Sequence, residues 1–365
     1  MTPRNFHDNL DRQLRLLRAE IGDSYGYSPL RAIPIEKKNS DKKRLICIPT
    51  VSDRLVQRAV LKKIEDRAAQ LGIVNDVSFG FVKGTIGGTK GVHAARNAAV
   101  SHRQLRPWAF KADISAFFDS IQRKDLVDRF DASFKLRSLR PLVRAAIECE
   151  VDDTNPTIRR ILLENKISKG KGLRQGMPLS PILSNFVLRD FDQAFGQHGY
   201  QLVRYADDLV VFSETEEECR RVQELTIVEL EKLGLSVSKD KTMICAPPKA
   251  VEFLGMELGL KAGSGKYCLT VSVEQIKAIK EAFSRYHDWS VAQKENLTVA
   301  SLFRRLGQMK EGYGAAYSAA ENITDLNKRL EQYVHNCANA IYSSLFGHQA
   351  ISKLDSLKRT FLMMP

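Results

Sequence analysis

The chain of 365 residues has few features of a disulfide-rich or zinc-binding protein. It contains six cysteines, none of them in a CxxC pair, and seven scattered histidines. Disulfide frameworks and structural zinc sites need closely spaced cysteines or histidines. We therefore expect neither, and predict reduced, mostly buried thiols in a cytoplasmic protein.

Long apolar runs are also absent. No stretch of about 18 apolar residues occurs, so we expect no transmembrane helix and no membrane partner. The first eight residues are polar and include an acid, unlike a secretory signal. With 43% hydrophobic and 27% charged residues, the chain can bury a sizeable core, and its length suits two or three lobes.

The charge is unevenly distributed along the chain, which has a net charge of +13. Residues 1–110 have 20 basic and 10 acidic side chains, residues 111–260 have 22 and 24, and residues 261–365 have 14 and 9. Such an excess of basic residues can simply belong to a solvated surface. The pattern is also the one expected if the two basic flanking regions neutralise nucleic-acid phosphates and the acidic middle region supplies carboxylates.

Hydrophobic periodicity predicts an α+β fold. We expect helices over residues 10–20, 53–70, 91–101, 123–149 (broken at Pro141), 180–195, 215–234, 273–287, 298–320 and 325–346. We expect strands over residues 31–50, 108–114, 201–212 and 251–258, mostly as hairpins, and a glycine-rich loop over 80–91. Strand pairs that alternate with helices predict an antiparallel sheet with helices on one face.

Three aspartates lie at the ends of apolar strands. Asp207 and Asp208 fall at the turn within residues 201–212, and Asp113 ends the run 108–112. Aspartate favours turns, but adjacent buried carboxylates are costly unless a cation neutralises them. Three carboxylates suit Mg²⁺, and two such ions about 4 Å apart activate an attacking hydroxyl and stabilise a leaving pyrophosphate.

Seven segments resemble the motifs of reverse transcriptases and follow one another in the family's order. Along the chain they are RLICIPTVSDRLVQ (44–57), SFGF (78–81), FKADISAFF (110–118), RQGMPLSP (174–181), YADD (205–208), LGLSVSKDKT (233–242) and FLG (253–255). The chain is thereby identified as a member of the bacterial reverse transcriptases, with group II intron-like fingers and palm. The resemblance implies a right-hand polymerase fold.

That resemblance implies a domain order and a metal centre. Residues 1–107 would be the fingers with an N-terminal helix, 108–260 the palm, and 261–365 a helical thumb with the C-terminal helices. Asp113, Asp207 and Asp208 would hold two Mg²⁺ ions, with Mn²⁺ as the alternative, and the carbonyl of Ile114 would be a further ligand.

The resemblance also implies residues that contact the nucleotide. Phe118 would be the steric gate that excludes a ribose 2′-hydroxyl, although a plain core aromatic is the alternative. Gln175 and Gly176 would lie under the incoming base pair, and Lys43 and Arg44 would hold the triphosphate.

Two further roles follow from the same resemblance. Lys241 would protonate pyrophosphate, unless it is an ordinary surface lysine. Phe253, Leu254 and Gly255 would form the primer grip.

The implied function is RNA-directed DNA synthesis from a primer 3′-hydroxyl in the bacterial cytoplasm. The partners would be an RNA template, a DNA primer or product, and deoxynucleotides. Residues 261–365 contain no Val-Thr-Gly retron signature, and we expect no maturase or endonuclease extension. The defence-associated or unassigned reverse transcriptases are therefore the nearest type, working with a structured non-coding RNA or a neighbouring defence protein.

Several alternatives stay open. The enzyme could instead be a retron or other mobile-element reverse transcriptase, or an RNA-dependent RNA polymerase, against which Phe118 argues. From a different class, it could be a catalytically inactive RNA-binding scaffold, against which the intact aspartates argue.

Overall fold

The computed structural model describes residues 2–23, 25–37, 40–82 and 90–347. The chain divides into two compact units, residues 1–246 and 247–365. The division into fingers, palm and thumb remains a prediction. Most of the expected glycine-rich loop, including Gly84, Gly87 and Gly88, lies outside the described residues.

The first unit begins with two helices, a β-hairpin and two longer helices. These elements are α1 (Pro3–His7), α2 (Leu10–Asp23), β1 (Arg31–Lys37), β2 (Ser40–Ile48), α3 (Val51–Glu65) and α4 (Val92–Leu105). Strands β1 and β2 pair antiparallel, as predicted. The hydroxyl of Thr50 caps α3 by accepting from the backbone N–H of Asp53 at 3.2 Å.

A four-stranded antiparallel sheet forms the centre of this unit. Its strands are β3 (Trp108–Asp113), β4 (Gln201–Tyr205), β5 (Asp208–Ser213) and β6 (Met243–Cys245), in the order β4-β5-β3-β6. Asp113, the last residue of β3, lies opposite Asp208, the first residue of β5. The sequence pattern did not predict β6, since three residues are too few to show a period.

Helices cover both faces of this sheet. Those after α4 are α5 (Phe117–Ser120), α6 (Arg123–Ser133), η1 (Arg137–Leu139), α7 (Arg140–Glu148), α8 (Pro156–Glu164), α9 (Ser180–Gln197), α10 (Glu216–Glu231) and η2 (Lys239–Lys241). Leu209 and Val211 of β5 join the core with side chains of α9 and α10. Helix α4 packs on the opposite face, where the rings of His102 and Phe212 are 6.4 Å apart. The prediction had included helices on one face only.

The helix expected over residues 123–149 is divided. It ends at Ser133, and α7 starts anew with Pro141 in its first turn. Proline is favourable there because the first helical N–H groups have no partner within the helix. The expected helix over 180–195 is α9, but Leu179 is its N-cap, and the hydroxyl of Ser180 donates instead to the carbonyl of Arg174.

The second unit combines a small sheet with a group of helices. Its elements are β7 (Val251–Phe253), β8 (Met256–Leu260), β9 (Tyr267–Thr270), α11 (Val273–Ser284), η3 (Arg285–His287), α12 (Trp289–Lys294), α13 (Val299–Ala316) and α14 (Ile323–Phe346). The strands pair in the order β7-β8-β9. The Asn322 side chain joins sheet to helix by both donating to and accepting from the backbone of Val271. The three predicted C-terminal helices are present, and α12 is additional.

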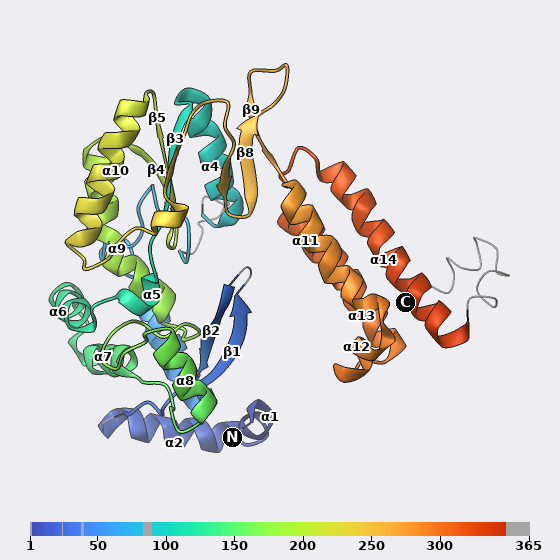
Figure 1. Ribbon diagram of the computed structural model, residues 1–365. Coiled ribbons are helices and arrows are strands. Elements are labelled where there is room, and N and C mark those ends of the chain that lie inside the picture. The colour runs from blue at the N-terminus through green and yellow to red at the C-terminus, as the bar shows by residue number, and fades with distance from the viewer. Residues whose placement is uncertain (1, 24, 38–39, 83–89, 348–365) are drawn as a thin grey trace. The chain divides into compact units, whose positions relative to one another are not determined.

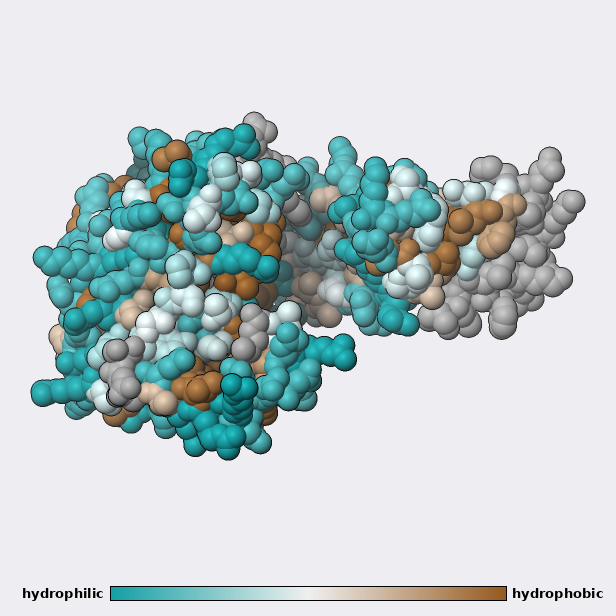
Figure 2. Space-filling model, turned by 90° about the horizontal axis from the view of Figure 1, so that it is seen from below, coloured by the Kyte–Doolittle hydropathy of each residue, from teal (hydrophilic) through white to brown (hydrophobic). Residues whose placement is uncertain are grey.

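The α+β class with antiparallel sheets is confirmed (Figure 1). All six cysteines are free, and five of them are buried, as expected. The face seen in Figure 2 is mostly hydrophilic and is interrupted by small apolar patches. Within the described residues, no helix is both long enough and apolar enough to cross a bilayer.

Candidate active site

The turn between β4 and β5 carries two of the predicted aspartates. Tyr205 and Asp208 form the pair that closes the hairpin, so Ala206 and Asp207 are its loop. Ala206 has φ of +57°, a left-handed conformation that is unusual for a residue other than glycine. The backbone N–H of Ile114 donates to the carbonyl of Asp207 at 3.1 Å. This bond ties the turn to the end of β3, next to Asp113.

A cavity of about 270 Å³ opens at this edge of the sheet. Seven of the predicted site residues line it: Lys43, Arg44, Asp113, Ile114, Gln175, Asp207 and Lys241. Residues that are far apart in the sequence therefore meet at one place. Basic side chains from β2 and η2 and acidic side chains from β3 and the turn lie around the same space.

Asp207 and Asp113 repel each other across this cavity. Burial, followed by the negative charge of Asp113, raises the pKa of the Asp207 carboxyl, while Lys241 and Arg44 act in the opposite direction. Lys241 also forms an ion pair with Asp113 at 2.9 Å. Lys241 and Arg44 thus neutralise only part of the negative charge of Asp113 and Asp207. Hard oxygen donors in such a setting fit a divalent cation.

Asp208 is placed differently from the other two aspartates. It does not line the cavity, and its carboxylate is paired with Lys111 of β3. Within the described part of the chain, no group of three or more His, Cys, Asp and Glu side chains is arranged to hold a metal ion. The cavity is therefore lined by Asp113 and Asp207 but not by Asp208, although Asp208 lies opposite Asp113 in the sheet, and the three-aspartate metal site remains a prediction.

The segment Gln175-Gly176 packs directly against β2. The backbone N–H of Cys47 donates to the carbonyl of Gln175 at 2.7 Å. Gly176 has φ of +105°, and a Cβ atom there would lie 2.3 Å from the carbonyl oxygen of Cys47. Only glycine fits, because both the backbone angle and the space exclude a side chain. This contact sets the distance between β2 and Gln175, both of which contribute to the lining of the cavity.

Phe118 is half-buried and lies outside the residues that line the cavity. Its ring is 5.4 Å from Phe117 and meets the ring of Phe81 edge to face at 6.4 Å. Phe81 also lies 6.1 Å from Tyr205. The predicted gate is thus part of an aromatic group beside the turn between β4 and β5, and its role as a gate remains a prediction.

The predicted primer grip belongs to the second unit. Phe253 is buried at the end of β7, and Leu254 and Gly255 form the turn to β8 with φ of +51° and +75°. The hairpin that was expected from the sequence is therefore present. Its contact with a primer remains a prediction.

Several residues at the site were missed by the sequence analysis. Lys111 pairs with Asp208, Asp119 and Ser238 line the cavity, and the Asn165 side chain donates to the carbonyl of Lys43 at 2.6 Å. Lys111 could have been found, because it precedes Asp113 by two residues and so shares its face of the strand. Asn165 follows a helix that was not predicted, and no motif marks it.

A family model described as "Reverse transcriptase (RNA-dependent DNA polymerase)" matches residues 35–258 of the chain. The chain belongs to the reverse transcriptase family. The matched region contains the whole four-stranded sheet, the β2 strand and every residue that lines the cavity. The predicted family is therefore confirmed.

Two curated relatives match about half of this reverse transcriptase. The group II intron-encoded protein LtrA of Lactococcus lactis subsp. cremoris is 27% identical over 181 residues, 49% of this chain and 27% of that protein. Protein YkfC of Escherichia coli (strain K12) is 28% identical over 187 residues, 50% of this chain and 45% of that protein. In each case the match covers less than half of the relative.

Among solved structures, a telomerase from Candida albicans in complex with a fragment of telomeric RNA is similar with a TM-score of 0.47. The sequence identity is 12%, over 95% of this chain and 66% of that chain.

Proposed function

We propose that this protein is an RNA-directed DNA polymerase that joins deoxynucleotides to the 3′-hydroxyl of a primer. The observation that carries the proposal is the shared cavity of Asp113 and Asp207, which Lys43 and Arg44 of β2 also line. Carboxylates and basic side chains around one cavity are the arrangement that a metal-assisted transfer of a nucleotide requires.

Each group of residues has a part in this reaction. Asp113 and Asp207, with Asp208 and the carbonyl of Ile114, would hold divalent cations, either Mg²⁺ or Mn²⁺. Bound cations of this kind polarise the phosphate and favour ionisation of the attacking hydroxyl. Arg44 and Lys43 would bind the triphosphate, and Lys241, whose ammonium lies 2.9 Å from Asp113, would supply a proton to the leaving pyrophosphate.

The test is primer extension by the purified protein on an RNA template with deoxynucleotides and Mg²⁺. We expect DNA synthesis by the wild type and its loss, by about 10³-fold or more, in Asp207→Asn, since the missing charge stabilises the transition state. Asp240→Asn is the matched control, because Asp240 is an exposed acid that does not line the cavity. Equal DNA synthesis by Asp207→Asn and the wild type would contradict a catalytic role for Asp207, whereas no DNA synthesis by the wild type would favour the scaffold alternative.

Sugar selectivity distinguishes DNA from RNA synthesis. We propose that Phe118 is the steric gate. The support is that the ring of Phe81 contacts both Phe118 and Tyr205, so Phe118 belongs to an aromatic group that reaches the YADD turn. Phe118→Ala should raise the use of ribonucleotides relative to deoxynucleotides, measured as the ratio of the two kcat/KM values. An unchanged ratio would remove this assignment and reopen the RNA polymerase alternative.

We also propose that the enzyme acts in anti-phage defence with a structured non-coding RNA or a neighbouring defence protein. The support is the basic balance of residues 1–110 and the missing retron signature in residues 261–365. Sequencing the nucleic acid that co-purifies from cells tests this. A single structured RNA that is encoded beside the gene is expected, whereas a random RNA population contradicts it.

A further inference from the structure

Arg204, the residue before Tyr205 on β4, is completely buried, with 0% of its side chain exposed. A buried guanidinium is costly unless its five N–H groups find acceptors. Two of them donate to the two carboxylate oxygens of Asp192 on α9, each at 2.6 Å. The Asp192 side chain is itself only 1% exposed.

The other three N–H groups of Arg204 reach three different segments. They donate to the hydroxyl of Ser78 at 2.9 Å, to the side-chain oxygen of Asn185 at 3.1 Å and to the backbone carbonyl of Ala206 at 3.0 Å. All five donors are therefore used. The last bond is made within the catalytic turn itself.

This bond fixes one of the two peptide groups that flank Asp207. The carbonyl of Ala206 is held by Arg204 from inside the protein, and the carbonyl of Asp207 is held by the N–H of Ile114. The backbone on both sides of Asp207 is thus held by hydrogen bonds. Ala206 needs such support, because its φ of +57° is one that residues other than glycine rarely adopt.

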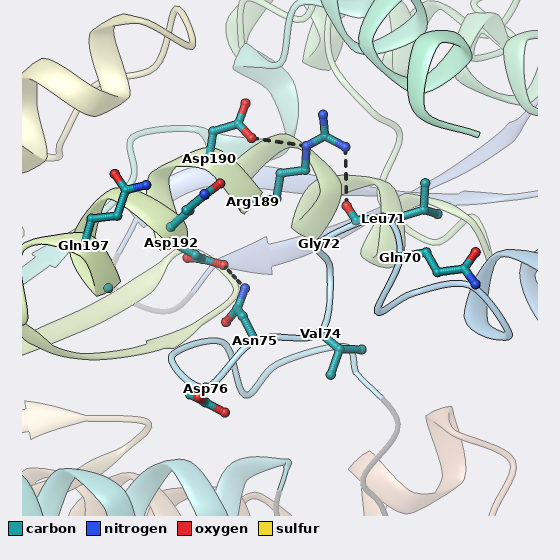
Figure 3. A pocket seen from close by; sticks show the side chains of 12 residues that line it. Gln70, Leu71, Gly72, Val74, Asn75, Asp76, Arg189, Asp190, Asp192 and Gln197 are labelled. Atoms are coloured by element: carbon teal, nitrogen blue, oxygen red, sulfur yellow. Dashed lines mark hydrogen bonds and ion pairs between the residues drawn. The ribbon is translucent and has the colours of Figure 1, made fainter. Parts of the chain in front are cut away.

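The network continues outward from Asp192. Asn75 donates to Asp192 at 2.8 Å, and its own oxygen accepts from the backbone N–H of Ser78 at 2.8 Å. Figure 3 shows Asn75 and Asp192 meeting on the wall of a cavity of about 670 Å³ between residues 70–76 and α9. Asp192 thereby joins the Arg204 guanidinium to the segment 75–78.

We propose that Arg204 is a positioning residue, which holds Asp207 in place for catalysis by clamping the carbonyl of Ala206. Stability alone does not explain a buried ion pair of this kind, since apolar side chains of similar volume often replace one without loss. Position does explain it, because a shift of about 1 Å in a catalytic group can cost about 10²-fold in rate. The proposal rests on the proposed polymerase function.

The deciding variant removes the charges together. Arg204→Met alone leaves Asp192 buried and unpaired, so it should lower the melting temperature strongly. Arg204→Met with Asp192→Leu should restore most of the melting temperature, while kcat stays lower by about 10- to 100-fold. Return of kcat to the wild-type value together with stability would overturn the proposal and leave Arg204 a purely structural residue.

Arg204→Lys tests the same idea if the double variant does not fold. It keeps the charge beside Asp192 but has one nitrogen in place of the planar fork, so it cannot make all five bonds. We expect lower kcat and a higher Mg²⁺ concentration at half-maximal rate, with KM for the template–primer unchanged. Wild-type values for both quantities in Arg204→Lys would overturn the proposal.

A control and a second readout separate this proposal from the proposed function. Ser78→Ala removes one partner of Arg204 but not its bond to Ala206, so its kcat should fall much less than that of Arg204→Lys. A fall as large as that of Arg204→Lys would show that packing, not the clamp, matters. Mn²⁺ binding measured by electron paramagnetic resonance needs no turnover, and we expect about tenfold weaker binding in Arg204→Lys. Equal affinity would overturn the clamp, even if the wild type made no DNA.

Discussion

The half-buried carboxyl of Asp207 sets its predicted role in catalysis against the stability of the fold. Burial and the charge of Asp113 raise the pKa of Asp207, so its ionised form is unfavourable in the folded protein. Asp207→Asn removes that charge. We expect the melting temperature to rise by about 2–4 °C, as for a gain of about 1 kcal/mol, while DNA synthesis is lost.

Thermal melting of the wild type and of Asp207→Asn at pH 7 measures this. Asp240→Asn, at an exposed position in η2, should leave the melting temperature unchanged. A lower melting temperature in Asp207→Asn would show that the carboxylate stabilises the fold, contrary to the repulsion inferred here.

Gly176 should be intolerant of even a methyl group. Gly176→Ala combines a left-handed backbone angle with a Cβ atom 2.3 Å from the carbonyl of Cys47. Gly199 offers a matched control, because its φ is +70° but no atom lies within 4 Å of an added Cβ. The backbone strain alone is worth about 1–3 kcal/mol, so both variants should be destabilised.

Urea unfolding of the two glycine variants separates strain from steric clash. Gly176→Ala should lose more free energy of unfolding than Gly199→Ala, and the difference reports the contact with β2. Equal losses of unfolding free energy in the two variants would mean that β2 moves away without cost, so that Gly176 does not set the distance between β2 and Gln175.

Glu150 gives the fold a dependence on acidic pH. Burial acts to raise the pKa of this carboxyl, but hydrogen bonds from Arg174, Gly170 and Arg123 outweigh burial and lower the pKa. Because the pKa of Glu150 is lower in the folded protein than in the unfolded chain, its ionised carboxylate stabilises the fold at a pH above the unfolded-state pKa of about 4.5. This stabilisation is lost as the pH falls through the pKa of the folded protein. Glu150→Gln should therefore be less stable than the wild type at pH 7, by about 1–3 kcal/mol.

The difference in unfolding free energy between the wild type and Glu150→Gln should become smaller below pH 4.5, because the wild-type carboxyl is then protonated. Unfolding free energies measured from pH 7 to pH 3 test this. A gap that stays constant over that range would show that the charge of Glu150 contributes nothing to stability.

At the scale of elements, the β1–β2 hairpin depends on residues that lie far away in the sequence. Strand β2 carries Lys43 and Arg44, and α8 packs beside it (Figure 1). Asn165, just after α8, donates to the carbonyl of Lys43 at 2.6 Å. Asn165→Ala should raise KM for deoxynucleotides about fivefold, as expected for one lost hydrogen bond, with kcat little changed.

Asn155→Ala is the control for this effect. Asn155 caps the start of α8 through the N–H of Thr157 at 2.9 Å and makes no contact with Lys43 in that role. Steady-state kinetics on both variants separates the two causes. The same rise in KM for Asn155→Ala would assign the effect to α8 as a whole rather than to the Lys43 contact.

The elements that the sequence predicted are those with a long period or a strong turn signal. Helices α9 and α10 were found because their apolar positions repeat over many residues. The YADD hairpin was found because two aspartates mark a turn between two short apolar strands. The sequence analysis missed strands β6 and β9 and helices α1, α5, α8 and α12, because they are short and take their stability from the surfaces on which they pack. The break in the helix over 123–149 was expected at Pro141, but it lies earlier, after Ser133.

At the scale of the whole molecule, the net charge of +13 predicts that binding of the proposed nucleic-acid substrate depends on salt. Phosphate contacts release counterions, so affinity falls with salt. With about 6–10 phosphate contacts, affinity for an RNA–DNA duplex should fall roughly 10³- to 10⁵-fold between about 50 and 200 mM salt. Fluorescence anisotropy with a labelled duplex measures this, and an affinity independent of salt would contradict phosphate binding by the basic flanks.

The sequence by itself determined the family, the α+β class and the candidate aspartates, because ordered motifs and apolar periods are local properties of the chain. Only the tertiary structure decided where the aspartates lie and which side chains surround them. Strand register and side-chain packing bring Asp113 and Asp207 into one cavity, turn Asp208 towards Lys111, and place Arg204 beneath Ala206. Lys111 and Asp208 are 97 positions apart, and the Arg204 guanidinium is held by Ser78, 126 positions away, so no local pattern contains these contacts.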